Sequence, residues 1–266
     1  MRLLVVVWAV AAQALSAPAA FAAEPFKLYD KFSDRPLDPG RWLGGERARS
    51  IKGGALHLMQ RDWSSDAANV GVTTTNWGVN FAEPATITQM RARIVVDALE
   101  ANACPGNGTV GDARVRIIGG FFNTGEAIAG SQVNDVTAQV RLARLSNSAD
   151  PAGLLRVEGV VIHCTTADCA AGFAIGNIVD LGTVAIGTAT TVQLEWDQGG
   201  QSFRFSRDGG RQAGTVGYAE SGLNPPGVLF RQLSTRLNVP NCMAGPLSGF
   251  ADAKFDNVYV NQTARP

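Results

Sequence analysis

Hydrophobic and polar side chains alternate at successive positions in several segments of this chain. In residues 136–142 (VTAQVRL) the apolar side chains occupy every second position, and the same alternation recurs in residues 192–197 and 203–206. Successive side chains of a β-strand point to opposite faces of a sheet, so this period predicts strands with one buried and one solvated face. Patterns typical of helices are almost absent beyond the first residues of the chain.

Further alternating or apolar segments predict more strands, separated by residues that favour turns. They are residues 26–32, 47–51, 55–60, 85–98, 113–122, 154–164, 212–218, 228–237 and 250–260. Paired glycines in residues 52–54, 198–200 and 208–210 are typical of hairpin turns. The spacing of these strands predicts an all-β fold, an antiparallel two-sheet sandwich that residues 23–266 form as a single domain.

The first 22 residues have the pattern of a secretory signal peptide. Arg2 supplies a positive charge, residues 3–15 are almost entirely apolar, and residues 20–22 (AFA) form a small-x-small cleavage motif. A membrane anchor is the alternative, but the apolar run is too short to cross about 30 Å of hydrocarbon comfortably. We therefore expect a secreted or periplasmic protein that is not inserted in a membrane once the signal is removed.

An even number of cysteines in an exported chain is typical of disulfide bonds. The four are Cys104, Cys164, Cys169 and Cys242. A short polar loop separates Cys164 from Cys169, which favours a local bridge and leaves the other two for a long-range bridge, although spacing alone does not fix the pairing. A zinc site is the alternative, but the sequence has neither a CxxC pair nor a second cluster of metal ligands.

The overall composition excludes several classes of function. Lys and Arg number 23, and Asp and Glu also number 23, and this balance argues against a nucleic acid as partner, since a phosphate backbone calls for a strongly basic face. With 30 glycines, 12 prolines and 45% hydrophobic residues, it is neither disordered nor fibrous. No GxSxG elbow, P-loop or HExxH motif is present.

Three segments together resemble a known superfamily. They are the YDKFS, LD, RW and IKGGALHL motifs within residues 29–58, the hairpin of residues 194–209, and AKFDNVYV at residues 253–260. These are similar to the opening, penultimate and closing strands of LamG-type jelly rolls of the concanavalin A-like lectin/glucanase superfamily. The resemblance implies a jelly-roll sandwich whose first and last strands are neighbours. It leaves function open, because the superfamily includes sugar-binding modules, adhesion domains and hydrolases.

The laminarinase-type hydrolases of that superfamily carry three acids on one strand, and two carboxyls about 5 Å apart are needed for retaining chemistry. Here Glu195 and Asp197 alternate correctly and are expected to share a face. Gln198, Gly199 and Gly200 form a turn where the third acid should stand. The pair is therefore a candidate for catalysis, and two solvated strand carboxylates are the alternative that we favour.

Two tryptophans are candidates for stacking against a sugar ring. Trp63 and Trp77 occur in segments that look like loops and contain many hydrogen-bonding side chains, including Asp66. An indole ring can cover the apolar face of a sugar while neighbouring polar groups bind its hydroxyls. The alternative is that both rings cap an edge of the sandwich.

Arginines recur at alternate positions in two predicted strands. Arg91 and Arg93 share one strand face, as do Arg114 and Arg116. If the two strands are neighbours, the four side chains form a cationic stripe that suits carboxylated or sulfated glycans. A solvated face with compensating acids elsewhere is the alternative.

No cofactor is expected. Calcium, which some relatives hold near their first and last strands, has Asp30, Asp252 and Asp256 as its available oxygen ligands, but the sequence contains no dense acidic loop. The favoured hypothesis is a secreted, non-catalytic β-sandwich that binds carbohydrate or another cell-surface ligand. The alternatives are a glycoside hydrolase-like enzyme that uses a carboxylate pair and a structural or adhesion domain without a small ligand.

Overall fold

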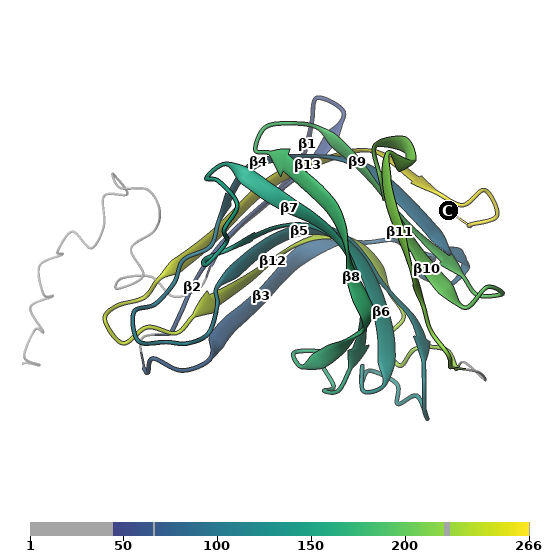
Figure 1. Cartoon of the computed structure of the whole chain (residues 1–266), viewed down its shortest axis with the longest axis horizontal. Coiled ribbons are helices and arrows are strands. Elements are labelled where there is room, and N and C mark those ends of the chain that lie inside the picture. The colour runs from purple at the N-terminus through teal and green to yellow at the C-terminus, as the bar shows by residue number, and fades with distance from the viewer. Residues whose placement is uncertain (1–44, 66, 221–223, 266) are drawn as a thin grey trace, which may run out of the picture. The chain divides into compact units, whose positions relative to one another are not determined.

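The computed structural model describes residues 45–65, 67–220 and 224–265, all within one compact unit, Leu37–Pro266. In this part of the chain, strands form two antiparallel sheets, as the alternating sequence predicts (Figure 1). The signal peptide, the predicted strand at residues 26–32, Asp30 and Asp66 lie outside the described residues.

One sheet has seven strands. Their order across the sheet is β1 (Glu46–Lys52), β2 (Ala55–Trp63), β13 (Ser248–Val260), β4 (Gln89–Glu100), β9 (Thr190–Asp197), β10 (Ser202–Arg207) and β11 (Gln212–Gly217). The last strand, β13, pairs with β2, so the first described hairpin and the end of the chain are neighbours. This is the arrangement that the resemblance of the two ends implies.

The other sheet has six strands. Their order is β3 (Val72–Asn80), β12 (Arg231–Pro240), β5 (Asp112–Asn123), β6 (Asp135–Leu145), β7 (Leu154–Cys164) and β8 (Gly172–Ala185). Two single turns of 3-10 helix, Pro84–Thr86 and Asp208–Gly210, are the helical segments among the described residues.

The core lies between the two sheets and follows the alternation of the sequence. Val136, Ala138, Val140 and Leu142 of β6 have no solvent exposure, and they face apolar residues of the opposite sheet. Contact between the layers is close enough that a Cβ built on Gly159 would lie 2.2 Å from Cγ of Phe205. Any larger residue at that position would therefore push the sheets apart.

The strands that differ from prediction do so for identifiable reasons. β3 and β8 are not predicted, because they lie at the two edges of their sheet and carry many polar or glycine residues. β4 begins at Gln89 rather than at residue 85, because Pro84–Thr86 forms a 3-10 turn. β12 begins at Arg231, and residues 228–230 form a connection before it.

Two disulfides link the described segments, with the pairing that the sequence favours. Cys104 bonds to Cys242 across a sequence separation of 138, joining the loop before β5 to the loop after β12. Cys164, the last residue of β7, bonds to Cys169 and closes a loop of short separation. All four cysteines are accounted for by these bonds.

Candidate functional site

The outward face of the six-stranded sheet gathers polar side chains from four adjacent strands. Residues that face each other across paired strands point to the same side of a sheet. The register places Ser234 of β12 opposite both Gly78 of β3 and Arg116 of β5. Arg236 is likewise opposite both Asn76 and Arg114. The inward positions between them are apolar or uncharged, so the guanidinium and amide groups collect on the outer face.

These side chains form the floor of a cavity of about 300 Å³, which we call the groove. Its floor comes from β3, β12, β5, β6 and β7, and its walls come from three connecting segments. The lining residues are Asn76, Asn80, Arg116, Ile118, Gln132, Thr137, Gln139, Ile162, Asp168, Cys169, Val228, Phe230, Gln232 and Arg236.

Arg116 occupies the centre of the floor and is held in place by neutral groups. It is 4% exposed. Its Nε donates to Ser234 Oγ at 3.1 Å, Nη1 donates to Gln139 Oε1 at 3.2 Å, and Nη2 donates to Asn76 Oδ1 at 2.7 Å. Because these bonds come from three different strands, the guanidinium is fixed before any ligand arrives.

Gly78 lets β3 lie very close to β12 beside Arg116. A Cβ at that position would lie 2.5 Å from the carbonyl oxygen of Leu233 and 2.7 Å from Cβ of Ser234. Backbone cannot move away from such a contact cheaply, so a glycine is required at this position, where β3 pairs with β12.

The charge on this face is not balanced. Arg114 pairs with Asp112 at 2.7 Å, and Arg141 pairs with Glu158 at 2.7 Å. Within the part of the chain that the structure describes, Arg116 forms no ion pair with a carboxylate. The same is true of Arg236, whose Nε donates to the amide oxygen of Asn238 at 3.2 Å.

The electrostatic consequence is visible in both pKa values. Burial lowers the pKa of Arg116 well below its usual value, and the neighbouring charges of Arg236 and Arg114 lower it further. Burial also lowers the pKa of Arg236, again with a contribution from Arg114. Burial and the neighbouring positive charges therefore disfavour the charged form of Arg116 and Arg236, and a nearby anion would favour it.

The floor also contains a hydrogen-bond donor without an acceptor. Gln139 is 1% exposed, and its Nε2 has no hydrogen-bond partner among the described residues. Buried amides are nearly always satisfied, so an orphan donor beside a cavity marks a place for an additional acceptor. Asn80 and Gln232 add two more amides to the floor, and no side-chain hydrogen bond within the described chain occupies either of them.

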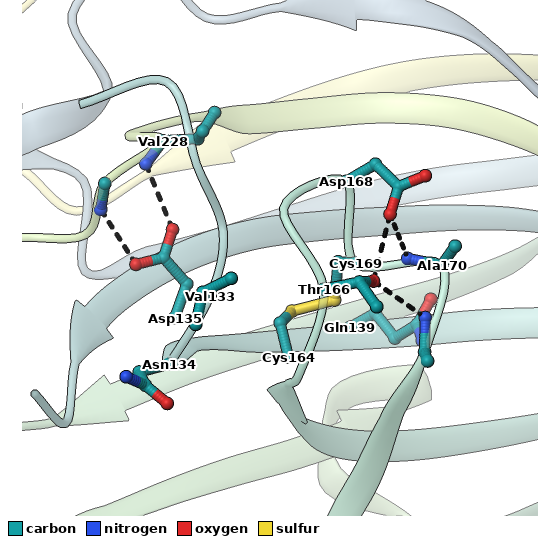
Figure 2. Close-up of a disulfide and its surroundings, with 12 residues drawn as sticks. Val133, Asn134, Asp135, Gln139, Cys164, Thr166, Asp168, Cys169, Ala170 and Val228 are labelled. Carbon is teal, nitrogen blue, oxygen red and sulfur yellow. Dashed lines mark hydrogen bonds between the residues drawn. A yellow bond between two sulfur atoms is a disulfide. The ribbon is translucent and has the colours of Figure 1, made fainter. Parts of the chain in front are cut away.

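One wall is held by a buried carboxylate. Asp135 is fully buried, and its oxygens accept hydrogen bonds from the backbone N–H of Gly227 at 2.8 Å and of Val228 at 3.0 Å (Figure 2). Nδ2 of Asn123 donates a third bond at 2.7 Å. The segment that carries Val228 and Phe230 is therefore anchored to the start of β6 rather than to its own turn. Gly120 lets it pass closely, because a Cβ there would lie 2.8 Å from the carbonyl oxygen of Val228.

The opposite wall is the loop closed by the local disulfide (Figure 2). Asp168 Oδ1 accepts bonds from the backbone N–H of Ala170 at 3.0 Å and from the hydroxyl of Thr166 at 2.9 Å. These two bonds lower the pKa of the exposed Asp168 carboxyl. Among the lining residues Asp168 is the one acid, so it brings a negative charge to a cavity whose floor is positive.

The two predicted tryptophans lie outside the groove. Trp63 is the last residue of β2, in the seven-stranded sheet, and is half-buried. Trp77 lies within β3 rather than in a loop, and alternation turns its ring away from the groove. Its ring packs against the core, and Nε1 donates to the carbonyl oxygen of Ala48 in β1 at 3.3 Å.

The predicted arginine stripe is divided between the two sheets. Arg91 and Arg93 belong to β4 of the seven-stranded sheet, whereas Arg114 and Arg116 belong to β5 of the six-stranded sheet. The β4 pair lines a second cavity, of about 340 Å³, on the outer side of its sheet. There Arg91 lies 4.3 Å from the ring centroid of Tyr259.

Both arginines of this second cavity are exposed, and one of them already has a carboxylate partner. Arg93 pairs with Asp256 at 3.5 Å, whereas Asp208, which lines the same space, pairs with Arg207. No buried arginine without a carboxylate partner is found there among the described residues. The groove is for this reason the stronger candidate for binding a ligand.

The predicted carboxylate pair shares a strand face, as expected from its spacing. Glu195 and Asp197 alternate with core residues of β9, on the outer side of the seven-stranded sheet. Glu195 accepts a hydrogen bond from Nε2 of Gln193, and Asp197 accepts one from the backbone N–H of Gly200 at 2.8 Å. These contacts hold a strand and a turn, respectively, and neither acid lines the groove.

The calcium candidates that the structure describes lie on β13. Asp252 and Asp256 are on the outer side of the seven-stranded sheet, where Asp256 pairs with Arg93. Within the described residues there is no group of three or more His, Cys, Asp or Glu side chains arranged to hold a metal ion. The same part of the chain contains no helix of the length and hydrophobicity that a membrane span requires.

Sequence reasoning missed most of the groove residues. Gln139, Gln232 and Arg236 look individually like solvated strand positions. The available signal was the alternation of residues 231–240, which puts Gln232, Ser234 and Arg236 on the face opposite the apolar residues.

No protein-family model matches the chain, and no curated protein matches it. Among solved structures, the carbohydrate recognition domain of Emp47p is 9% identical with a TM-score of 0.36, over 80% of this chain and 87% of that one. A legume lectin-like domain from Entamoeba histolytica is 7% identical with a TM-score of 0.36, over 85% and 94%. The alginate lyase from Klebsiella pneumoniae is 10% identical with a TM-score of 0.37, over 80% and 83%. At these identities and TM-scores the likenesses assign neither a family nor a function to this chain.

Proposed function

We propose that this chain is a secreted or periplasmic, non-catalytic β-sandwich protein that binds carbohydrate in the groove of its six-stranded sheet. The observation that carries the proposal is the composition of the groove. Amide, hydroxyl and guanidinium groups from adjacent strands line it together with Ile118, Ile162 and Phe230. The two disulfides support an oxidising compartment.

The mixture of groups suits a sugar. A pyranose ring presents hydroxyls around its edge and apolar C–H groups on its faces, so its site needs hydrogen-bonding groups beside an apolar surface. Asn80 and Gln232 are unoccupied amides on neighbouring strands, opposite each other in register. Phe230 supplies an aromatic surface from the wall above them.

The site is also rigid enough to discriminate between ligands. Its donors are fixed on paired strands, Arg116 is held by three bonds, and both walls are anchored. A preformed site loses little conformational entropy when a ligand binds.

The test is retention of the protein by a panel of polysaccharides in affinity electrophoresis, together with a glycan array. We expect the wild type to bind at least one glycan. The double variant Asn80→Ala/Gln232→Ala should bind it about ten-fold more weakly, as expected for two lost hydrogen bonds.

The matched control is Gln89→Ala, which removes an exposed amide from β4 of the other sheet. It should bind as the wild type does. A blank panel and array would remove the proposed function. Equal weakening by the groove variant and the control would place the ligand elsewhere and overturn the assignment of the site.

A further inference from the structure

Resting on the proposed function, we infer that the groove selects glycans that carry negative charge, and that Arg116, Arg236 and Gln139 form its anion subsite. The shared chemistry is an oxyanion attached to a sugar, either a carboxylate or a sulfate. The favoured site is the junction of β12, β5 and β6.

The floor of the groove offers several hydrogen-bond donors without acceptors. A guanidinium has five N–H donors. Arg116 directs three of them to protein oxygens, which leaves one on Nη1 and one on Nη2. Gln139 Nε2 adds an orphan amide, and both Nη atoms of Arg236 are without a hydrogen bond in the described chain.

Acceptors at the same place are already in use. Gln139 Oε1 and Asn76 Oδ1 both accept from Arg116, and Asn238 Oδ1 accepts from Arg236. A ligand that offers only hydroxyl donors would therefore find few partners here. A ligand oxyanion accepts several bonds at once and matches a surface that is rich in donors.

The side chains that line the groove also have a net positive charge. The groove is lined by Arg116 and Arg236 against Asp168, two cations and one anion, which gives a net charge of +1. The neighbouring arginines on this face are neutralised by Asp112 and Glu158. Since the floor is buried, the interaction between a guanidinium and an incoming anion is screened less than at an open surface.

The position of Asp168 makes the inference testable in two directions. Its carboxylate lies on the wall and attracts Arg236. For an anionic ligand the same charge is repulsive, so removing it should strengthen binding while removing Arg236 weakens it. The Asp168→Asn variant keeps an oxygen that can accept the bonds from Ala170 and Thr166.

The experiment measures affinity for polygalacturonate, dextran sulfate and a neutral set of dextran and galactan, at low and high salt. We expect the wild type to bind an acidic polymer, with affinity that falls as salt rises. Arg236→Gln should weaken that binding about ten-fold, and Asp168→Asn should strengthen it about three-fold, because charge-assisted bonds and repulsion act in opposite directions.

Arg204→Gln is the matched control, since it removes an exposed arginine from β10 of the other sheet. It should leave affinity unchanged. Arg116→Gln is a second variant, whose thermal unfolding is measured alongside binding because the residue is buried. Retention of its melting transition together with lost binding supports the subsite.

Each outcome has a separate meaning. Binding of polygalacturonate identifies a carboxylate as the anion, and binding of dextran sulfate alone identifies a sulfate. Binding of neutral polymers only overturns the anion subsite and leaves the proposed function intact, whereas binding of no polymer overturns both. Acidic binding that responds equally to Arg236→Gln and Arg204→Gln overturns the subsite as well.

Discussion

The backbone N–H of Val228 donates to Oδ2 of Asp135 at 3.0 Å, so a buried carboxylate at the start of β6 holds the segment that forms one wall of the groove. The second oxygen of Asp135 accepts from the N–H of Gly227 and from the amide of Asn123. A carboxylate accepts several bonds without offering a proton, which is why it suits a cluster of three donors.

Replacing Asp135 with Ala should therefore lower the free energy of unfolding by about 3 kcal/mol, because three buried donors lose their acceptor. Asp135→Asn keeps one acceptor oxygen and should cost about half as much. Urea unfolding measures both. A stability of Asp135→Ala equal to that of the wild type would show that the wall is held by other contacts.

The two disulfides should contribute unequally to stability. The Cys104–Cys242 bond closes a loop with a sequence separation of 138, whereas Cys164 and Cys169 are separated by 5. In the loop-entropy model, these separations correspond to about 5 and about 2 kcal/mol, respectively. Paired Cys→Ala variants, compared by urea unfolding, should show this order.

The two disulfides should have the opposite order of importance for ligand affinity. Cys169 lines the groove, and its bridge to Cys164 fixes the wall that carries Asp168. The Cys164→Ala/Cys169→Ala variant should therefore lose more affinity for a glycan than the Cys104→Ala/Cys242→Ala variant does at a temperature where both are folded. A greater loss of affinity in the Cys104→Ala/Cys242→Ala variant would show that the Cys164–Cys169 bond does not shape the binding site.

Arg231 is a buried cation whose guanidinium donates hydrogen bonds to backbone carbonyl oxygens. It is 1% exposed; its guanidinium donates to the carbonyl oxygens of Ile87, Gly120 and Phe230 and lies 3.8 Å from the ring centroid of Phe121. Burial lowers the pKa of Arg231 to about 10, so the charge itself is unfavourable there.

The hydrogen bonds should outweigh that cost. Arg231→Met leaves three carbonyl groups without their donor and is expected to destabilise the fold by about 3 kcal/mol. Thermal and urea unfolding of the variant provide the measurement. A more stable Arg231→Met protein would mean that removing the buried charge outweighs the lost bonds.

Asp252 should make a small, pH-dependent contribution to the free energy of unfolding. Burial raises the pKa of Asp252, and the charge of Asp97 raises it further. An acid whose pKa is raised on folding favours the folded state most at low pH, and this contribution is lost as pH rises through the folded pKa. Asp252→Asn should therefore gain stability relative to the wild type between about pH 3 and pH 6.

The gain should stay below about 1 kcal/mol, because the side chain is partly solvated and the repulsion is screened. Unfolding curves of both proteins at pH 3 and pH 7 give the comparison. A larger advantage of Asp252→Asn at pH 3 than at pH 7 would contradict the assigned direction of the pKa shift.

Much of the fold is predictable because alternation encodes it directly. The pattern of residues 154–164 predicts a strand, and this segment is β7, with Leu155, Val157 and Val161 buried. Edge strands carry less of this information: β8 contains Gly172, Gly176 and Gly182, and many of its side chains are exposed. When neither face of a strand is well buried, its sequence is not constrained to alternate between apolar and polar residues.

The groove could not be predicted in the same way. Arg116 and Ser234 are hydrogen-bonded although 118 positions separate them in sequence. Their meeting depends on β12 lying between β3 and β5, and a single sequence does not specify that order. Alternation could place Arg116 on an outer face, but it could not say which residues would surround it.

The most direct test of the account is a crystal structure of the protein with an oligosaccharide that it retains in the polysaccharide panel. We expect the sugar over the six-stranded sheet, with a ligand oxygen within hydrogen-bonding distance of Arg116 or Arg236 and with Phe230 against the ring. An oligosaccharide ordered instead on the outer side of the seven-stranded sheet, beside Arg91 and Tyr259, would contradict it.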